Sequence, residues 1–280
     1  MVNGCTAIYL LFDSVINGMA DGLPKVTEKC VEKLTGSIRD AIRGTGCKGA
    51  VIGLSGGIDS AVVTKLCVNA IGAENVLCIF MPSRVTIVSD YRITSDLCSD
   101  WGFEYKILEI QPAIDSLSAI LTSSDDTPLD RGNIAARCRM IVLYNLAKKY
   151  GRIVLGTSNE SEIMMGYFTK FGDGACDIAP LSGMYKTHVR QIAKIIGVPN
   201  EIIQRPPTAG LWEGQTDEDD MGITYDTLDM ILYSVKLERS DAEISKNTGV
   251  SIDKIAEIRK TIEKSEHKRM PPIQLGFRFS

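Results

Sequence analysis

The residues best suited to chemistry lie in one short stretch, residues 53–60, which reads GLSGGIDS. Its glycine pair can adopt positive φ and lets a phosphate group approach the main chain closely. Ser55 and Ser60 add hydroxyl donors, whereas the charge of Asp59 has the wrong sign to attract a phosphate. A carboxylate in a phosphate site is explained by a Mg²⁺ ion between it and the phosphate oxygens. The stretch therefore predicts a site for phosphate groups and Mg²⁺.

The segments on either side of this stretch are those that would position it. Residues 49–52 are short and apolar, as in a buried strand, and residues 61–68 are typical of a helix. A strand, a glycine-rich turn and a helix in this order point backbone N–H groups and a positive helix end at an anion. The stretch is not a Walker loop, which ends in Gly-Lys-Ser/Thr, and it lacks the third glycine of a dinucleotide fingerprint.

Strands and helices are predicted to alternate through the first half of the chain. Strands are expected at residues 76–81, 103–110 and 153–155, and helices at 24–43, 89–101, 112–122 and 133–150. This alternation favours an α/β fold with a doubly wound, mostly parallel sheet flanked by helices. Ligands of such sheets bind beyond the carboxyl ends of the strands. Ser55, Ser83 and Thr157 all fall at those ends.

The second half of the chain contains two unusual loops. Residues 166–174 are glycine-rich, aromatic and charged, and residues 205–222 form a long polar stretch of the kind found in lids and binding loops. A helix is expected between them at residues 186–197, and three more between residues 224 and 265. We interpret residues 1–280 as one domain with a helical C-terminal part, residues 224–270.

Composition excludes several classes of protein. The chain has 280 residues, 44% of them hydrophobic and 24% charged, and a net charge of −4 without a basic block. A dedicated nucleic-acid binder usually shows a basic face. Residues 241–258 have a helix-turn-helix look, but their mixed charge suits a solvated face or a partner helix better than a DNA groove. No nucleic-acid partner is therefore expected.

Location is inferred from cysteines and hydropathy. None of the eight cysteines forms a C-x-x-C pair, which is typical of thiols in a reducing cytoplasm. The apolar run at residues 7–12 is too short for a signal peptide and no stretch is long enough to span a membrane. We expect a cytoplasmic protein without a membrane partner, in which residues 1–23 are an N-terminal extension of unclear role.

The motifs together resemble a known family. The loop at residues 53–60 is similar to the pyrophosphate loop of the N-type ATP pyrophosphatases, which cleave ATP between the α and β phosphates. Further stretches resemble the ammonia-dependent NAD⁺ synthetases within that superfamily, in the family's order. They are GYFTKFGDG at residues 166–174, DIAPL at 177–181, KT at 186–187, LWEGQTDE at 211–218 and EHKR at 266–269.

The resemblance implies a reaction and a fold. The family is a ligase with an adenine nucleotide α-hydrolase-like fold, and it adenylates the carboxylate of deamido-NAD⁺ with ATP and releases pyrophosphate. Ammonia then displaces AMP to give NAD⁺. The family is a homodimer with the deamido-NAD⁺ site at the subunit interface. About fifty residues precede the loop, too few for an amidase domain, so free ammonia is the expected donor unless a separate glutaminase subunit docks.

The resemblance also implies roles for particular residues. Asp59 and Lys186 would be catalytic, and Asp59 and Glu162 would hold Mg²⁺. ATP would be bound by Gly53, Leu54, Ser55, Gly56, Gly57, Ile58, Asp59, Ser60, Thr157, Lys186 and Thr208. Deamido-NAD⁺ would be bound by Arg137, Lys170, Asp177, His267 and Lys268. The motif does not distinguish Arg137 from Arg139, and at Gly210 the chain departs from the acidic residue of many relatives.

Other functions stay open at this point. A different ATP pyrophosphatase with the same loop, for example a tRNA-modifying enzyme, would adenylate another acceptor. Such enzymes tend to carry catalytic cysteines or a basic RNA-binding extension, neither of which is apparent. A nucleotide-binding sensor without catalysis would be favoured by the loss of Asp59, Lys186 or Glu162, and all three are present. A DNA-binding regulator would use the C-terminal helices as its reader.

Overall fold

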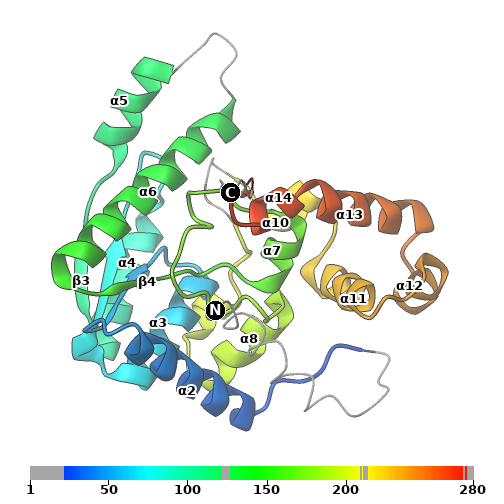
Figure 1. The fold of residues 1–280 in the computed structure, drawn as a ribbon, viewed down its shortest axis with the longest axis horizontal. Helices are drawn as coiled ribbons and strands as arrows, with labels where there is room; N and C mark the ends of the chain where they lie inside the picture. The colour runs from blue at the N-terminus through cyan, green and yellow to red at the C-terminus, as the bar shows by residue number, and fades with distance from the viewer. Residues whose placement is uncertain (1–21, 122–126, 209, 211–213, 274, 276–280) are drawn as a thin grey trace, which may run out of the picture.

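A parallel sheet lies at the centre of the molecule (Figure 1). The computed structural model describes residues 22–121, 127–208, 210, 214–273 and 275, and among these the sheet has four strands in the order β3-β2-β1-β4. The strands are β1 (Ala50–Gly53), β2 (Val76–Phe80), β3 (Glu104–Ile107) and β4 (Ile153–Leu155). Each pairing is parallel, which confirms the predicted doubly wound sheet.

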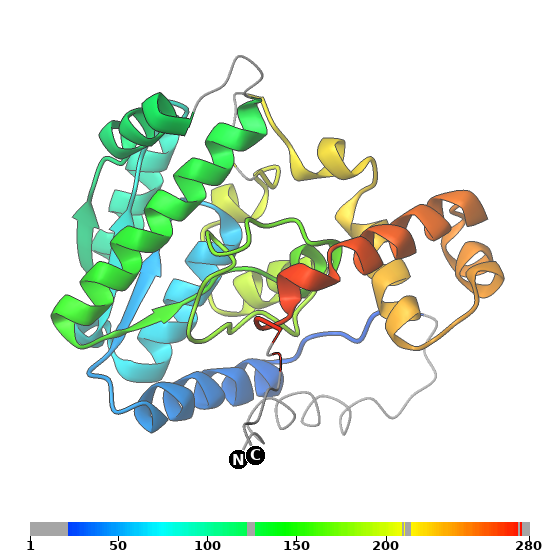
Figure 2. The same ribbon diagram turned by 45° about the horizontal axis from the view of Figure 1, so that its top comes forward.

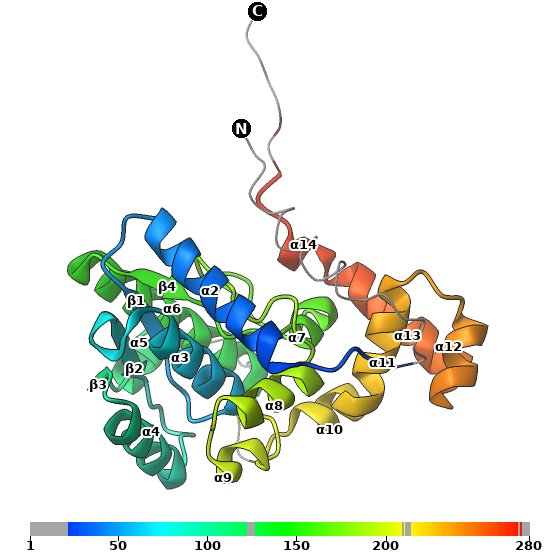
Figure 3. The same cartoon turned by 90° about the horizontal axis from the view of Figure 1, so that it is seen from below.

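Helices cover both faces of this sheet (Figures 1 and 3). One face packs against α2 (Glu28–Gly44), α3 (Ile58–Ile71), α4 (Val88–Trp101) and α8 (Lys186–Ile195). The other packs against α5 (Gln111–Leu121) and α6 (Pro128–Tyr150). A short 3₁₀ helix, η1 (Ala73–Asn75), leads into β2, and α7 (Glu160–Met165) follows β4.

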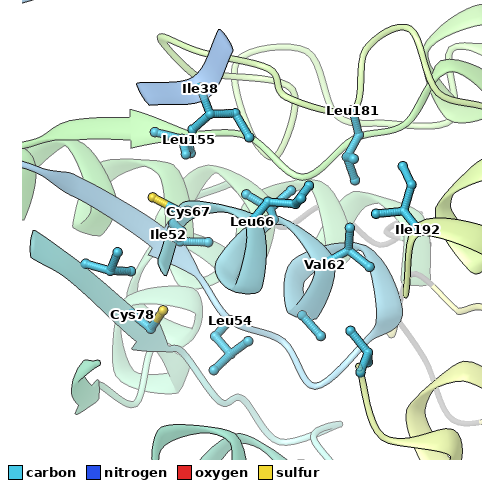
Figure 4. Close-up of a cluster of buried hydrophobic side chains, with 14 of the residues drawn as sticks. Ile38, Ile52, Leu54, Val62, Leu66, Cys67, Cys78, Leu155, Leu181 and Ile192 are labelled. Carbon is cyan, nitrogen blue, oxygen red and sulfur yellow. The ribbon is translucent and has the colours of Figure 1, made fainter. Parts of the chain in front are cut away.

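The two faces bury alternate strand residues, because successive side chains of a strand point to opposite sides. Ile52 and Cys78 face α3, where they join Val62, Leu66 and Ile192 in one buried cluster (Figure 4). The intervening residues, Val51, Leu77, Ile79 and Val154, pack under α5 and α6. The strands β1, β2 and β4 are apolar on both faces, as expected of buried parallel strands, whereas the edge strand β3 is partly exposed.

The C-terminal helices bury a third cluster beside the sheet layer (Figure 2). They are α11 (Tyr225–Lys236), α12 (Asp241–Thr248), α13 (Ile252–Lys264) and the short α14 (Glu266–Arg269). Tyr225, Ile244 and Ile255 are fully buried in this cluster, to which Tyr185 from the sheet layer contributes. The expected helix-turn-helix arrangement is present, with Gly249 at the turn between α12 and α13. Arg259 of α13 forms an ion pair with Asp241 of α12, in which Nε and Oδ1 lie 2.6 Å apart.

Several boundaries differ from the prediction. Helix α2 begins at Glu28 and not near Pro24, because the Thr27 hydroxyl accepts from Cys30 N and caps the helix. Helix α6 begins five residues earlier than predicted, at Pro128, after the capping box of Thr127 and Asp130. The second predicted loop, residues 205–222, ends in a helix, α10 (Asp217–Met221), and the short α9 (Asn200–Ile203) lies just before that loop.

The N-terminal extension predicted at residues 1–23 lies outside the described residues except for Gly22 and Leu23. Leu23 packs against the C-terminal cluster. Of the helices in the described part of the chain, none combines the length and the apolar character needed to cross a membrane.

Candidate active site

The glycine-rich loop joins β1 to the N-terminus of α3. Leu54 N donates to Ile79 O at 3.0 Å and so extends the sheet pairing into the loop. Helix α3 begins after Gly57, which makes no side-chain capping bond. The first N–H groups of a helix have no acceptor within it, so those of α3 are oriented toward an incoming anion. The positive φ of 86° at Gly56 is a conformation that favours glycine.

The two predicted serine donors also hold the loop together. Ser60 Oγ lies 3.1 Å from Ser55 Oγ and donates to Gly57 O at 3.0 Å. Ser55 Oγ accepts from Gly57 N at 3.2 Å. These bonds fix the shape of the turn through side chains within it, which explains why both hydroxyls belong to this short sequence.

Three charged side chains meet at the end of this loop. Lys186 Nζ lies 2.6 Å from Asp59 Oδ2 and 3.2 Å from Glu162 Oε1. They come from the first turns of α8, α3 and α7, three elements widely spaced in the sequence. The Lys186 side chain is only 3% exposed, whereas the two carboxylates keep 17% and 16% of their surface. The carboxylates are therefore the members of the group that a ligand can reach.

Lys186 is held charged in a buried position. Burial alone would lower its pKa, but Asp59 and Glu162 outweigh that effect, so the pKa is raised. The ammonium also lies 5.1 Å from the centre of the Tyr225 ring, whose hydroxyl donates to Asp217 Oδ2 at 3.0 Å. A lysine fixed in this way offers a permanent positive charge beside the phosphate loop.

The carboxylates around Lys186 give this site an excess of acidic groups. Burial raises the pKa of Glu162 to about 8, although Lys186 opposes the change and Asp59 adds to it. Burial likewise raises the pKa of Asp217, again opposed by Lys186. One ammonium does not balance three carboxylates, so a further cation would stabilise their ionised forms.

Asn159 orients this group, although the sequence analysis gave it no role. It caps α7: Asn159 Oδ1 accepts from Glu162 N at 3.0 Å, and Glu162 Oε2 accepts from Asn159 N at 3.3 Å. Its amide nitrogen donates to Asp59 Oδ1 at 2.9 Å. The N-x-x-E spacing of a capping box was the available signal for the cap, but not for the contact with Asp59.

The remaining residues predicted to bind ATP are Thr157 and Thr208. Thr157 follows β4, at the carboxyl edge of the sheet next to the glycine-rich loop of β1. Thr208 is exposed and accepts from Gly210 N at 3.0 Å. Gly210 has a φ of 61°, which accounts for a glycine at this position. Arg205, earlier in the same loop, binds Asp90 at 2.6 Å.

The residues predicted to bind deamido-NAD⁺ form a second group around residues 166–177. Lys170 Nζ donates to His267 O at 2.5 Å, and Arg137 Nη2 donates to Lys170 O at 3.5 Å. Lys268 Nζ donates to Gly166 O at 2.7 Å and to Phe168 O at 2.9 Å. The structure thus brings Arg137, Lys170, His267 and Lys268 together from distant parts of the chain.

Asp177 and Arg139 have different surroundings. Asp177 Oδ2 accepts from Val154 N at 3.0 Å and Oδ1 from Tyr144 Oη at 3.3 Å, so this carboxylate ties its loop to β4. Arg139 Nε donates to Met81 O at 3.3 Å, after the end of β2. Of the two arginines left open by the sequence, Arg137 is therefore the one beside Lys170.

Helix α7 connects the two groups. Glu162 lies in its first turn, and the loop bound by Lys268 begins directly after its last residue. Arg269 Nη1 donates to Ile163 O at 3.1 Å and to Met164 O at 2.9 Å, so α14 is fixed to the same helix (Figure 2). With six residues, α7 is about 9 Å long. Two sites at the two ends of α7 suit an elongated ligand. Its reacting group would lie beside Asp59, Glu162 and Lys186, and the rest of it would lie against residues 166–177.

The side chains at this centre that could bind a metal ion are the carboxylates of Asp59 and Glu162. In the described ranges, no group of three or more His, Cys, Asp and Glu side chains is arranged to hold a metal ion. Asp59 and Glu162 nevertheless direct one oxygen each at a single cation, the Lys186 ammonium. Mg²⁺ commonly takes one or two carboxylates and completes its shell with phosphate oxygens and water, so this pair fits Mg²⁺ held together with a nucleotide.

Comparisons with known proteins agree with one another. A family model described as NAD synthase matches residues 30–272. The NH₃-dependent NAD⁺ synthetase of Pyrococcus horikoshii is 46% identical over 251 residues, which cover 88% of this chain and 95% of that relative. A solved structure of an NMN synthetase from Francisella tularensis is 38% identical, with a TM-score of 0.78, and covers 88% of this chain and 97% of its own. The NH₃-dependent NAD synthetase from Campylobacter jejuni is 31% identical, with a TM-score of 0.75 and coverages of 89% and 98%.

Proposed function

Because this chain belongs to the NAD synthase family, we propose that it is a ligase that converts deamido-NAD⁺ to NAD⁺ with ATP and ammonia. The observation that carries this proposal is the meeting of Asp59, Glu162 and Lys186 at the end of the glycine-rich loop. This group places a fixed ammonium and two accessible carboxylates where an ATP phosphate would enter. The charge distribution suits a reaction whose leaving group is pyrophosphate.

The chemistry proceeds in two steps. A carboxylate oxygen of deamido-NAD⁺ attacks the α-phosphorus of ATP, the bond to the β-phosphate oxygen breaks, and pyrophosphate leaves with its electron pair. Ammonia then attacks the carbonyl carbon of the acyl adenylate and loses a proton, while the bond to AMP breaks. The products are NAD⁺, AMP and pyrophosphate. Negative charge grows on phosphate oxygens in the first step, so electrostatic stabilisation is the main demand on the protein.

The residues of the chain meet this demand in complementary ways. Backbone N–H groups at the start of α3 bind phosphate oxygens through the turn of Gly56 and Gly57. The Lys186 ammonium stabilises the charge that develops on the departing pyrophosphate, and its burial strengthens the interaction because the surrounding dielectric is low. Asn159 keeps Asp59 aimed at the same place.

A magnesium ion completes the proposed site. Asp59 and Glu162 would hold it, since their oxygens already converge on one cation and the three carboxylates exceed the charge of Lys186. When bound with ATP, Mg²⁺ supplies neutralisation of phosphate charge. Thr157 and Thr208 are proposed as further ATP contacts because of their positions at the strand edge and in the second loop.

The second group of residues is proposed to bind deamido-NAD⁺ away from its reacting carboxylate. The dinucleotide carries a pyrophosphate bridge, which demands cations, and Arg137, Lys170 and Lys268 supply them. His267 and Asp177 provide polar contacts at the edge of this group. Helix α7 then sets the spacing between this part of the substrate and the ATP phosphates.

We further propose that two copies of the chain form a homodimer. Large apolar side chains are exposed on α5 and α6, which stand side by side in Figure 1. They are Ile120, Leu121, Leu129 and Ile141, each more than half exposed. Large apolar side chains exposed on neighbouring helices are a common feature of interaction surfaces. Ile141→Asp should convert the dimer to a monomer in light-scattering measurements, whereas Ile252→Asp, on an exposed part of α13, should not.

Free ammonia is proposed as the nitrogen donor, as in the named relatives, and the cytoplasm as the place of action. The seven cysteines in the described part of the chain are all free thiols, which suits a reducing compartment.

A second acceptor is worth direct comparison because of the NMN synthetase among the structural relatives. An enzyme that makes NMN by this chemistry would start from nicotinate mononucleotide. This compound has the same reacting carboxylate as deamido-NAD⁺ but lacks the adenylate half of that dinucleotide. Measuring kcat/KM for both acceptors with saturating ATP, Mg²⁺ and ammonium tests the proposed substrate. Preference for deamido-NAD⁺ supports it, and turnover of nicotinate mononucleotide alone would overturn it.

A further inference from the structure

The N-terminus of α8 is capped by residues from two other helices. Its own N-cap residue is Tyr185, which makes no side-chain capping bond of the usual Ser, Thr, Asp or Asn type. Lys186 N donates instead to Ser161 Oγ at 3.0 Å, and Thr187 N donates to Asp229 Oδ2 at 2.8 Å. Two of the backbone donors that a helix start leaves without partners are thus satisfied by side chains distant in the sequence.

Ser161 and Asp229 are also bonded to each other. Ser161 Oγ donates to Asp229 Oδ1 at 2.5 Å. Because the same serine oxygen accepts from Lys186 N, its single proton is directed at Asp229 and the direction of every bond is determined. Both residues are fully buried, so this chain of hydrogen bonds is shielded from water.

The network joins α7 and α8, which carry Glu162 and Lys186, to α11 (Figure 3). Ser161 precedes Glu162 on α7, Lys186 is the first residue of α8, and Asp229 lies on α11. The backbone of Lys186 is therefore fixed to the helical turn that carries Glu162. Because the Lys186 side chain is only 3% exposed, it has little room to adjust, and a shift of its backbone would displace the ammonium from Asp59 and Glu162.

A buried carboxylate is a costly way to stabilise a fold. Burial raises the pKa of Asp229, and its bonds to Ser161 and Thr187 oppose this change. Apolar residues of similar shape often fill such positions with no loss of stability. A fully bonded polar network, in contrast, fixes one geometry. The network of Ser161 and Asp229 bonds the backbone of Lys186 itself, which indicates that the fixed geometry positions this residue in the site.

We propose that Ser161 and Asp229 are positioning residues, which set the place of the Lys186 ammonium against Asp59 and Glu162. The proposal rests on the role given above to Lys186. Neither residue touches substrate, and both act through the backbone of α8. Removing either one should reduce the rate of adenylation while the binding of deamido-NAD⁺, which occupies the other end of α7, changes little.

Two variants test this role. Ser161→Ala removes the bridge, and Asp229→Asn keeps the shape and the acceptor for Thr187 N but removes the carboxylate. We expect kcat for both pyrophosphate release and NAD⁺ formation to fall about tenfold to a hundredfold, because small misplacements of catalytic groups have effects of this size. KM for deamido-NAD⁺ should stay within about twofold. All assays are run below the Tm measured for each variant.

The control is Ser234→Ala, which deletes another buried hydroxyl from α11 without a bond to α8. It should keep its kcat, and its Tm is measured alongside those of the other variants. Wild-type kcat in both Ser161→Ala and Asp229→Asn would overturn the proposal, as would an equal loss of kcat in Ser234→Ala.

A double-mutant cycle shows whether the effect passes through Lys186. In a Lys186→Met background, Ser161→Ala should cause no further loss of kcat. The same loss in both backgrounds would overturn the proposal. Wild-type kcat in Lys186→Met would overturn the role of Lys186, and the positioning role with it. A wrong acceptor is recognised separately, because the wild-type protein would then release pyrophosphate with nicotinate mononucleotide and form no NAD⁺ from deamido-NAD⁺.

Discussion

The amide nitrogen of Asn159 donates to Asp59 Oδ1 at 2.9 Å, and the other oxygen of Asp59 binds Lys186. One carboxylate is thereby held from two sides, by a helix cap and by a buried ammonium. Because Asn159 also binds the backbone of Glu162, it links the two carboxylates proposed to hold Mg²⁺. The contact explains how residues about a hundred positions apart in the sequence keep a fixed relative orientation.

Asn159→Ala should therefore affect both stability and metal dependence. Loss of the cap is expected to cost about 1 kcal/mol of unfolding free energy. Loss of the bond to Asp59 should raise the Mg²⁺ concentration needed for half-maximal activity and lower kcat. Ser240→Ala is the matched control, since Ser240 caps α12 with the same type of capping box. If both variants shift the Mg²⁺ dependence equally, Asn159 acts only as a cap.

Asp59→Asn should keep the fold and lose adenylation. The side chain is partly exposed, so we expect only a small change in Tm, whereas one metal ligand and one partner of Lys186 are lost. Electrostatic groups of this kind contribute factors of about 10²–10³ to kcat. Pyrophosphate release is the measurement, and Asp226→Asn, which breaks an exposed pair with Arg190, is the control. Normal turnover by Asp59→Asn would contradict the metal assignment.

Lys170→Met should weaken the binding of deamido-NAD⁺ and leave ATP binding unchanged. Lys170 belongs to the group around residues 166–177 and not to the phosphate loop. Removing one cation from a phosphate contact should raise KM for deamido-NAD⁺ about tenfold, as expected for a charged hydrogen bond. Lys246→Met on α12 serves as the control. An equal rise in KM for ATP would show that the two groups do not bind separate substrates.

The contribution of His188 to the stability of the fold should fall as the pH drops below about 6.5, the ordinary pKa of histidine. Burial lowers the pKa of His188, whose Nδ1 accepts from Tyr185 N at 3.3 Å and whose Nε2 donates to Pro24 O at 2.9 Å. The folded protein therefore keeps this ring neutral while the unfolded chain takes up a proton. The unfolded state binds more protons at this ring, so the part of the unfolding free energy that depends on His188 decreases as pH falls, by up to about 1.4 kcal/mol per pH unit.

Urea unfolding between pH 7.5 and 5.5 measures this contribution. His188→Gln should be less stable at pH 7.5 but should lose less stability on acidification than the wild type. His267→Gln changes an exposed ring and serves as the control. Parallel pH dependences for the wild type and His188→Gln would contradict the role of His188.

Much of this architecture was visible in the sequence because its signals are local. Apolar runs predicted the strands, and the glycine-rich loop predicted the position of α3. The family motifs predicted that Asp59, Glu162 and Lys186 belong to one site. The predicted start of α6, residue 133, lies five residues after the observed one, although the spacing of Thr127 and Asp130 in the sequence is that of a capping box. Residues 211–213, part of a motif quoted for the family, lie outside the described residues.

The positioning of the site was not visible for a physical reason. Asp229 caps α8 by accepting from Thr187 N, 42 residues earlier in the chain, and no periodicity predicts such a contact. Lysine side chains are mostly exposed in proteins, yet Lys186 is buried because two carboxylates compensate its charge. Ser55 and Ser60 were interpreted as phosphate donors, and their bonds within the turn depend on a backbone shape that the sequence does not specify.

The central claim is that this site adenylates deamido-NAD⁺ for attack by ammonia, and one assay tests it most directly. The protein is incubated with ATP, Mg²⁺ and deamido-NAD⁺, with and without an ammonium salt, and AMP, pyrophosphate and NAD⁺ are quantified. The account predicts NAD⁺ only with ammonium, in equal amounts with AMP and pyrophosphate. Absence of NAD⁺ under these conditions, or its formation without any ammonia source, would contradict it.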